Sequence, residues 1–190
     1  FRPTPSDAFS RPGLNALLQT DLMVIHPPVV FAYYTLCIGV GAHAITAMLI
    51  RGTPARDRIL HLARPALWVG TLGVGLGGLW AYNVLDWGGY WAWDPVETGS
   101  LLPWLALILL LHLRLPKGMA KEDDWFIGLG ILPAFFSFHA TLVTRANGVW
   151  QSVHAFVAEG EIDPSKGPIQ RILELGFGDA PGIEVHLYLL

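Results

Sequence analysis

Residues 87–104 read WGGYWAWDPVETGSLLPW, and this stretch decides how the rest of the chain is organised. It holds four of the eight tryptophans and two carboxylates, and hydrophobic runs flank it at residues 66–85 and 101–113. Tryptophan is common at membrane interfaces because its ring is apolar while its N–H group can stay in water. Three tryptophans within seven residues, with two glycines between the first and the second, are too dense for an interfacial belt. The stretch therefore predicts an aromatic surface at a membrane edge, suited to a planar hydrophobic ligand.

The composition is that of a membrane protein. Of the 190 residues, 53% are hydrophobic and only 14% are charged, whereas a soluble domain has about 25% charged residues. The net charge of −3 gives no basic surface of the kind that nucleic acid requires. Cys37 is the single cysteine, so the sequence contains neither a disulfide framework nor a CxxC redox pair.

Apolar segments long enough, or nearly long enough, to cross a bilayer recur along the chain. They are residues 29–50, 65–85, 100–115 and 125–143. Helices and closed barrels are the structures that satisfy backbone polar groups in lipid. The sequence therefore predicts an all-α fold, a polytopic membrane helical bundle with about four transmembrane helices. The third segment is short, so part of the Trp-rich loop, residues 86–100, is expected at membrane depth.

Basic residues are distributed unevenly between the polar segments. A polar loop expected at residues 51–64 has four arginines and residues 114–121 have three lysines or arginines, whereas residues 86–99 have none. Basic residues favour the cytoplasmic side of a membrane. The first two segments are therefore expected in the cytoplasm, and the Trp-rich loop on the outer face. His26 and His154 then lie on the same outer face as this loop.

The predicted organisation has three parts. They are an outer-face loop at residues 1–25, membrane helices at 26–143 that include the Trp-rich loop, and an outer-face loop at 144–190 leading to a further helix. His26-Pro27-Pro28 is expected to start the first helix, because proline is tolerated in a first turn.

The motif WGGxWxWDPVE, followed by SxxPW, resembles the "WWD" signature of membrane haem-handling proteins. The PVE ending and the SxxPW spacing resemble the CcmF family, the haem lyase subunit of bacterial-type cytochrome c maturation, and its close relatives that serve nitrite reductase. HPP at residues 26–28 and SVHAF at residues 152–156 fit the same pattern. The resemblance covers residues 12–157. Family members are much longer, so this chain resembles their central part.

The resemblance implies a haem site on the outer face. His26 and His154 fall on the two outer histidines that flank the Trp-rich loop and serve as haem ligands in the family. Neutral imidazole is a common haem ligand, although either histidine alone could be a packing or capping residue. The implied cofactor-binding residues are His26, His154, Trp87, Trp91, Trp93 and Asp94.

Asp94 and Glu97 are two carboxylates three residues apart, a spacing that can place both on one face of a helix. No nucleophile, phosphate-binding loop or metal-ligand cluster accompanies them in the sequence, so an acid/base role is disfavoured. Asp94 directly precedes Pro95 and is predicted to cap the third helix or to bond backbone N–H groups, which would hold the Trp-rich loop in place.

His112 is a candidate for a second site. It lies 12 residues beyond Ser100, about 18 Å along a helix, and polar residues at membrane depth are often functional. The resemblance implies that His112 ligates a separate, permanently bound b-type haem, with its partner ligand on a helix outside this chain. His43 is also expected deep in the membrane, where a packed core histidine is the favoured interpretation.

The function that the resemblance implies is that of a haem lyase subunit in the bacterial cytoplasmic (inner) membrane. Haem would arrive on the periplasmic face from the carrier CcmE, and apocytochrome c would be presented with a CcmH-type thiol-handling subunit. Quinol could supply electrons to the membrane haem. Two alternatives stay open: a protein that delivers haem without attaching it, as CcmC does, and a structural membrane subunit with an interfacial aromatic belt.

Overall fold

The computed structural model describes residues 18–50, 55–85, 89–116 and 122–145, together with Ser152, His154, residues 165–167 and Gln170. Its elements are α1 (Asp21–Leu49), α2 (Ala55–Trp80), the short π-helix η3 (Ala81–Leu85), α3 (Pro95–His112) and α4 (Glu122–Arg145). Within the described residues the regular structure is entirely helical, so the all-α prediction is confirmed.

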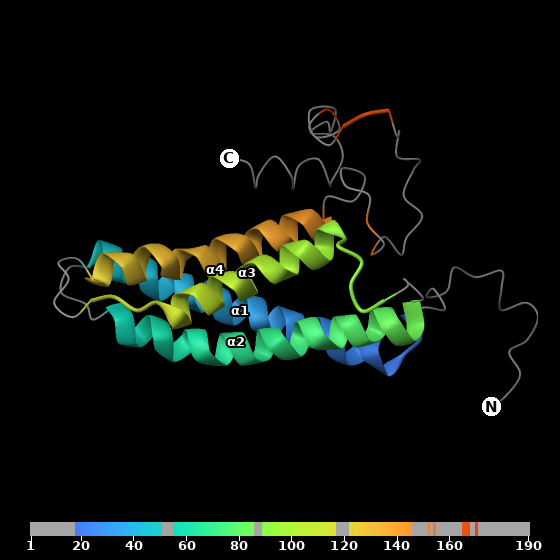
Figure 1. The fold of residues 1–190 in the computed structure, drawn as a ribbon, viewed down its shortest axis with the longest axis horizontal. Helices are drawn as coiled ribbons and strands as arrows, with labels where there is room; N and C mark the ends of the chain where they lie inside the picture. The colour runs from blue at the N-terminus through green and yellow to red at the C-terminus, as the bar shows by residue number, and fades with distance from the viewer. Residues whose placement is uncertain are drawn as a thin grey trace, which may run out of the picture.

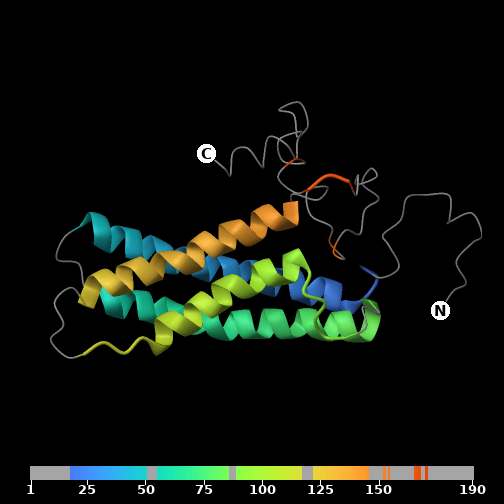
Figure 2. The same cartoon turned by 45° about the horizontal axis from the view of Figure 1, so that its top comes forward.

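The helices form an up-and-down bundle (Figure 1). α1 packs against α2 and α4, and α3 packs against α4 and α2, so that α1 and α3 lie across the bundle from each other (Figure 2). All four helices are long and apolar enough to cross a membrane. We call one end of the bundle the aromatic end. α1 and α3 begin there, and η3 and α4 terminate there. The chain is an integral membrane protein.

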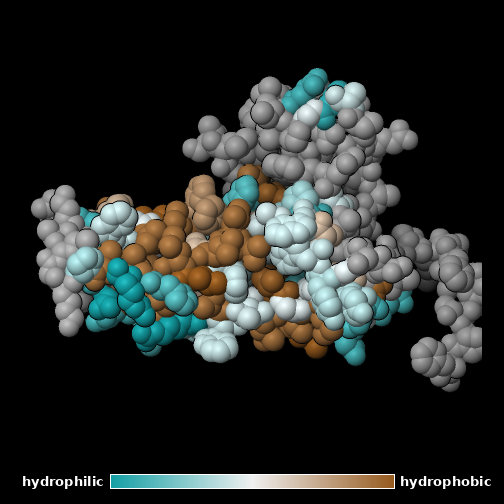
Figure 3. Space-filling model, viewed as in Figure 1, coloured by the Kyte–Doolittle hydropathy of each residue, from teal (hydrophilic) through white to brown (hydrophobic). Residues whose placement is uncertain are grey.

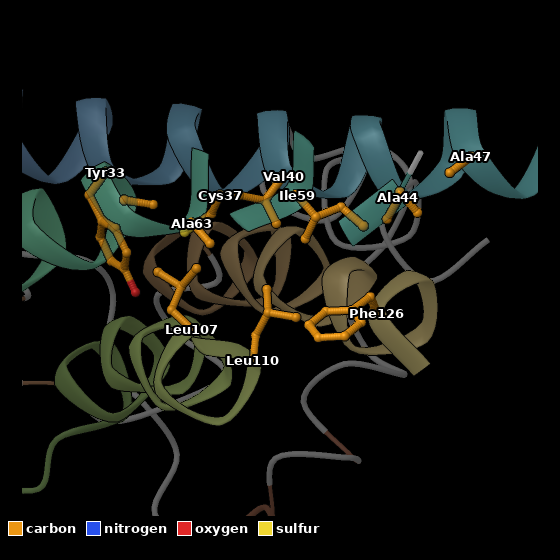
Figure 4. Close-up of a cluster of buried hydrophobic side chains, with 12 residues drawn as sticks. Tyr33, Cys37, Val40, Ala44, Ala47, Ile59, Ala63, Leu107, Leu110 and Phe126 are labelled. Carbon is orange, nitrogen blue, oxygen red and sulfur yellow. The ribbon is translucent and has the colours of Figure 1, made fainter. Parts of the chain in front are cut away.

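The core is built from one stripe of α1 and apolar residues of the three neighbouring helices. Tyr33, Cys37, Val40 and Ala44 recur every three or four residues on α1 and are fully buried. They pack with Ile59 and Ala63 of α2, Leu107 and Leu110 of α3, and Phe126 of α4 (Figure 4). Between these larger side chains, the small residues Ala44 and Ala63 let α1 and α2 approach closely, as packing between helices in lipid requires.

Helix α1 begins at Asp21 and not at His26, so the first helix starts earlier than expected. The Thr20 hydroxyl caps it by accepting a hydrogen bond from the Leu22 N–H group at 3.0 Å. Pro27 and Pro28 therefore lie inside the helix, where each removes one backbone hydrogen bond. The affected carbonyls lie in the first turns, where water can reach them.

Residues 55–64 are helical, which corrects the expectation of a polar loop at residues 51–64. Ala55, Ile59 and Ala63 are buried against the bundle at four-residue intervals, and the arginines between them point outward. This periodicity carries the helix through a charged sequence. Figure 3 shows the result as a hydrophilic surface where α2 begins and a hydrophobic one along the middle of the bundle.

The other two helices also begin before their predicted starts, and α3 ends at His112, before the expected end at residue 115. α3 begins at Pro95, five residues before the expected start, because Asp94 caps it. α4 begins at Glu122 with three acidic residues in its first turn, where negative charge is favourable to the helix dipole. Most of the loop predicted at residues 144–190 lies outside the described residues.

Candidate functional site

The aromatic end contains a group of ring side chains contributed by η3 and by the loop before α3. Tyr82 and Tyr90 are both exposed, and their rings stack with centroids 4.3 Å apart and planes 7° apart. This contact ties the loop to η3. A π-helix such as η3 is rare and frequently occurs at functional sites.

Glu97 holds the loop in a fixed conformation. Its Oε2 accepts hydrogen bonds from the Ala92 N–H group at 2.8 Å and from the Asp94 N–H group at 3.3 Å, the residues on either side of Trp93. Between these two anchors Trp93 adopts a left-handed backbone with φ 56°, which is unfavourable for a bulky residue. The side chain is left 73% exposed. The buried carboxylate of Glu97 thus presents an indole ring at the surface.

Trp91 lies beside Trp93. The two rings meet edge to face, with centroids 6.1 Å apart. The Trp91 Nε1 atom is buried and has no hydrogen-bond partner among the described residues. A buried N–H group without a partner is costly and calls for an explanation such as an absent ligand. Trp87, predicted as part of the same surface, lies outside the described residues.

Asp94 has the capping role that the sequence predicted. Its Oδ1 accepts hydrogen bonds from the Val96 N–H group at 2.8 Å and from the Glu97 N–H group at 3.4 Å, which makes it the N-cap of α3 within a capping box. The same oxygen accepts a hydrogen bond from the His154 Nδ1–H group at 2.9 Å. Asp94 therefore connects the start of α3 to a histidine 60 residues further along the chain.

His26 lies against α2 near its end. Its Nδ1 forms a hydrogen bond of 3.0 Å with the Gly73 carbonyl oxygen. A carbonyl can only accept, so Nδ1 carries the proton and Nε2 is the nitrogen able to bind a metal. The ring also meets Trp80 edge to face at 5.9 Å. These two contacts and the neighbouring Gly77 fix its orientation.

The structure brings His26 and His154 to the same end of the bundle as the Trp-rich loop. The two imidazoles are near enough to interact electrostatically. In both rings Nδ1 is engaged, by a carbonyl in His26 and by a carboxylate in His154. The second nitrogen, Nε2, is then the potential ligand in each. Such a pair of imidazoles with exposed aromatic rings nearby fits haem iron and its flat macrocycle.

Gly77 is required for the position of His26. A Cβ atom at residue 77 would lie 2.9 Å from His26 Cε1, and the ring cannot move away without losing its bond to Gly73. If His26 ligates haem, as the family resemblance implies, Gly77→Ala should displace the imidazole and reduce haem affinity at least tenfold, an effect in the range known for groups that orient metal ligands. Gly75→Ala is the matched control, because a Cβ there meets no atom within 4 Å. Haem titration of both variants checks this, and equal affinities would contradict it.

His112 lies apart from this group. It is the last residue of α3, about 26 Å along the helix axis from Pro95. Its Nδ1 forms a hydrogen bond of 2.8 Å with the Ile108 carbonyl oxygen, and its side chain is exposed in this chain. As in the other two histidines, Nδ1 carries the proton and Nε2 is the potential ligand. The ring faces away from the core, where a ligand from another helix could meet it.

Four residues of the aromatic end were missed or undervalued in the sequence. They are Trp80, Tyr82 and Tyr90, which were given no role, and Glu97, whose two loop hydrogen bonds were not foreseen. The signal was the density of aromatic residues from position 80 to position 93, which starts before the Trp-rich loop itself.

Comparison with known proteins now decides the family. Residues 2–150 match the family described as Cytochrome C assembly protein, a range that takes in all four helices and the Trp-rich loop. The chain belongs to this family. Its curated relatives show further that it is of the CcmF type, which confirms the resemblance found in the sequence.

Three relatives from two organisms illustrate the similarity. The probable cytochrome c-type biogenesis protein NrfE of Escherichia coli (strain K12) is 40% identical over 150 residues, which cover 77% of this chain and 27% of NrfE. CcmF of the same strain is 36% identical over 174 residues, 87% of this chain and 25% of CcmF. CycK of Bradyrhizobium diazoefficiens is 39% identical over 159 residues, 81% of this chain and 23% of CycK.

The chain therefore spans about a quarter of the length of these relatives. No solved structure matches it.

Proposed function

We propose that this protein holds haem at the aromatic end and presents it for covalent attachment to apocytochrome c, as a haem lyase subunit. The observation that carries the proposal is the meeting of His26, His154 and the exposed Trp93 at one end of the bundle. Membership of the cytochrome c assembly family supports it.

In this proposal His26 and His154 bind the two axial positions of the haem iron through Nε2. The position of His26 is fixed by two membrane helices, because the residue belongs to α1 and its side chain is hydrogen-bonded to Gly73 of α2. His154 is tied to the start of α3 by Asp94. Trp93 and Trp91 would pack against the macrocycle, and the buried Trp91 N–H group would be available to a polar atom of the ligand. This chain thus supplies positioning.

The bond-forming chemistry belongs to the haem and to the apocytochrome. Each cysteine S–H group of a CxxCH segment adds across one vinyl double bond, which forms one C–S bond and one C–H bond and needs no net oxidant. The aromatic end is half open, with Trp93, Tyr82 and Tyr90 exposed. An apocytochrome segment can therefore approach the vinyl groups while the histidines hold the iron.

His112 is assigned to a second, permanently bound haem of the b type. Its exposed ring at the end of α3 supports a ligand role that is completed by a histidine on a helix outside this chain. Bound there, haem b would supply one-electron chemistry that keeps the substrate iron ferrous, with quinol as electron donor. The residues present fit this, because His112 already has the tautomer that metal binding requires.

We assign the aromatic end to the periplasmic side of the bacterial inner membrane. Arg56 and Arg58 lie at the opposite end of the bundle, on the first turns of α2, which the positive-inside rule places in the cytoplasm. Proposed partners on the periplasmic side are a CcmE-type haem carrier, a CcmH-type thiol-handling subunit and apocytochrome c.

The sidedness has a direct test. In intact cells, a membrane-impermeant thiol reagent should label Gly88→Cys in the Trp-rich loop and should leave Thr53→Cys, between α1 and α2, unmodified until the membrane is opened. Both are made with Cys37→Ser so that one thiol is present. Labelling of Thr53→Cys alone would reverse the orientation and remove the periplasmic haem site.

A haem lyase subunit and a haem-delivery protein differ in which intermediate accumulates when the protein is inactive. Cells lacking the native protein and supplied with inactive variants should accumulate carrier-bound haem and apocytochrome without thioether-linked cytochrome c. A delivery protein would instead leave the carrier unloaded. Gel staining for covalent haem, on carrier and cytochrome in the same membranes, distinguishes the two.

A further inference from the structure

We propose that Asp94 is a positioning residue that makes His154 the stronger of the two axial ligands, so that the hold on haem depends on the oxidation state of the iron. This inference rests on the proposed function. The observation behind it is the bond from the His154 Nδ1–H group to the Asp94 carboxylate at 2.9 Å, set against the bond from His26 to a neutral backbone carbonyl.

The Nδ1–H groups of the two histidines donate to different acceptors, a carboxylate for His154 and a backbone carbonyl for His26. A carboxylate that accepts a hydrogen bond from the Nδ1–H group polarises this group and makes Nε2 a stronger electron donor. The same bond fixes the tautomer and the direction of the ring. A neutral carbonyl does this to a lesser extent. The Asp94 side chain is only 3% exposed, so water screens its charge weakly. His154 is therefore a more strongly donating ligand than His26.

Asp94 is itself firmly placed. Its Oδ1 accepts from the Val96 and Glu97 N–H groups at the start of α3, where the helix dipole favours a negative charge. These contacts hold the carboxylate in the position from which it bonds His154. The His154 side chain is thereby held at the start of α3.

A dependence on oxidation state follows from the ligand asymmetry. An electron-rich imidazole stabilises ferric iron more than ferrous iron. The aromatic end should therefore bind ferric haem more tightly, and reduction of the iron should weaken the bond to His154. A grip that loosens on reduction suits a site that hands its ligand on.

The test uses Asp94→Asn. Asparagine caps a helix about as well as aspartate. Its side-chain oxygen can still accept a hydrogen bond from His154, but it has no charge. In purified protein carrying His112→Ala, so that the inner haem does not contribute, the dissociation constant for ferric haem should rise about tenfold. That for ferrous haem should change less, so the midpoint potential should move to a more positive value. Asp123→Asn, which removes an exposed carboxylate in the first turn of α4, should change neither.

A readout without haem accompanies this titration. The ¹⁵N NMR signals of His154 in the haem-free protein should report a proton on Nδ1, and Asp94→Ala should abolish that preference. A proton fixed on Nε2 in the unaltered protein would overturn the inference. So would equal changes in ferric and ferrous affinity in Asp94→Asn, which would mark Asp94 as a structural cap only.

Failure of the proposed function gives a different pattern. If His154→Ala binds haem as well as the unaltered protein, the outer haem site itself is wrong. If His154→Ala loses haem but Asp94→Asn binds like the unaltered protein in both oxidation states, the site stands and only the role of Asp94 is refuted.

Discussion

Replacing either His26 or His154 with alanine is expected to abolish cytochrome c assembly and to leave the haem at His112 in place. In the proposed site each histidine would hold the haem iron from a different part of the chain, His26 from α1 and His154 from its contact with Asp94, so loss of either would leave the site incomplete. His112 lies at the far end of α3, about 26 Å from the start of that helix, so its haem should be insensitive to both changes. Covalently attached haem and the spectrum of the retained haem should be measured in the same membranes.

His139→Ala is the matched control for this pair. His139 is a half-buried histidine of α4 that has no assigned role, and its replacement should leave assembly at the normal level. Normal assembly in His26→Ala or His154→Ala would show that the histidine concerned is not an essential ligand. Loss of the retained haem in either variant would contradict the separation into two sites.

The second large effect is expected at His112. His112→Ala should reduce haem that copurifies with the protein to background, because the proposed second haem would lose the one ligand that this chain supplies to it. Insertion should be unchanged, since the ring is exposed in the bundle and its bond to Ile108 lies within its own helix.

Protein level by immunoblot and haem by the pyridine haemochrome spectrum are the two measurements. His61→Ala, which alters an exposed histidine of α2, serves as the control. An unaltered haem content per protein in His112→Ala would remove the inner site from the proposal.

The sequence was sufficient for the helix number and for the cap at Asp94, because apolar runs and an Asp-Pro step before a helix are local signals. It was misleading at residues 55–64. Charged residues hid a helix there, although alanine and isoleucine at four-residue spacing already marked its buried face. It was also misleading at His26, where Pro27 and Pro28 suggested a helix start although Thr20 and Asp21 form the actual one.

The contacts that build the site could not be read from spacing. The bond between Asp94 and His154 spans 60 residues, and that between His26 and Gly73 spans 47. Both depend on how the helices are arranged. The left-handed backbone at Trp93 likewise results from two hydrogen bonds to Glu97, since no intrinsic preference of tryptophan favours it. Local sequence predicted which residues were candidates, and tertiary packing determined their partners.

In the proposed site, His26 and His154 bind one haem iron together. The most direct measurement is the electron paramagnetic resonance spectrum of ferric haem added to protein that carries His112→Ala. We expect a low-spin signal typical of two imidazole ligands, and its conversion to a high-spin signal in both His26→Ala and His154→Ala. A low-spin signal that persists in either variant, or one that never forms in the parent protein, would contradict the claim.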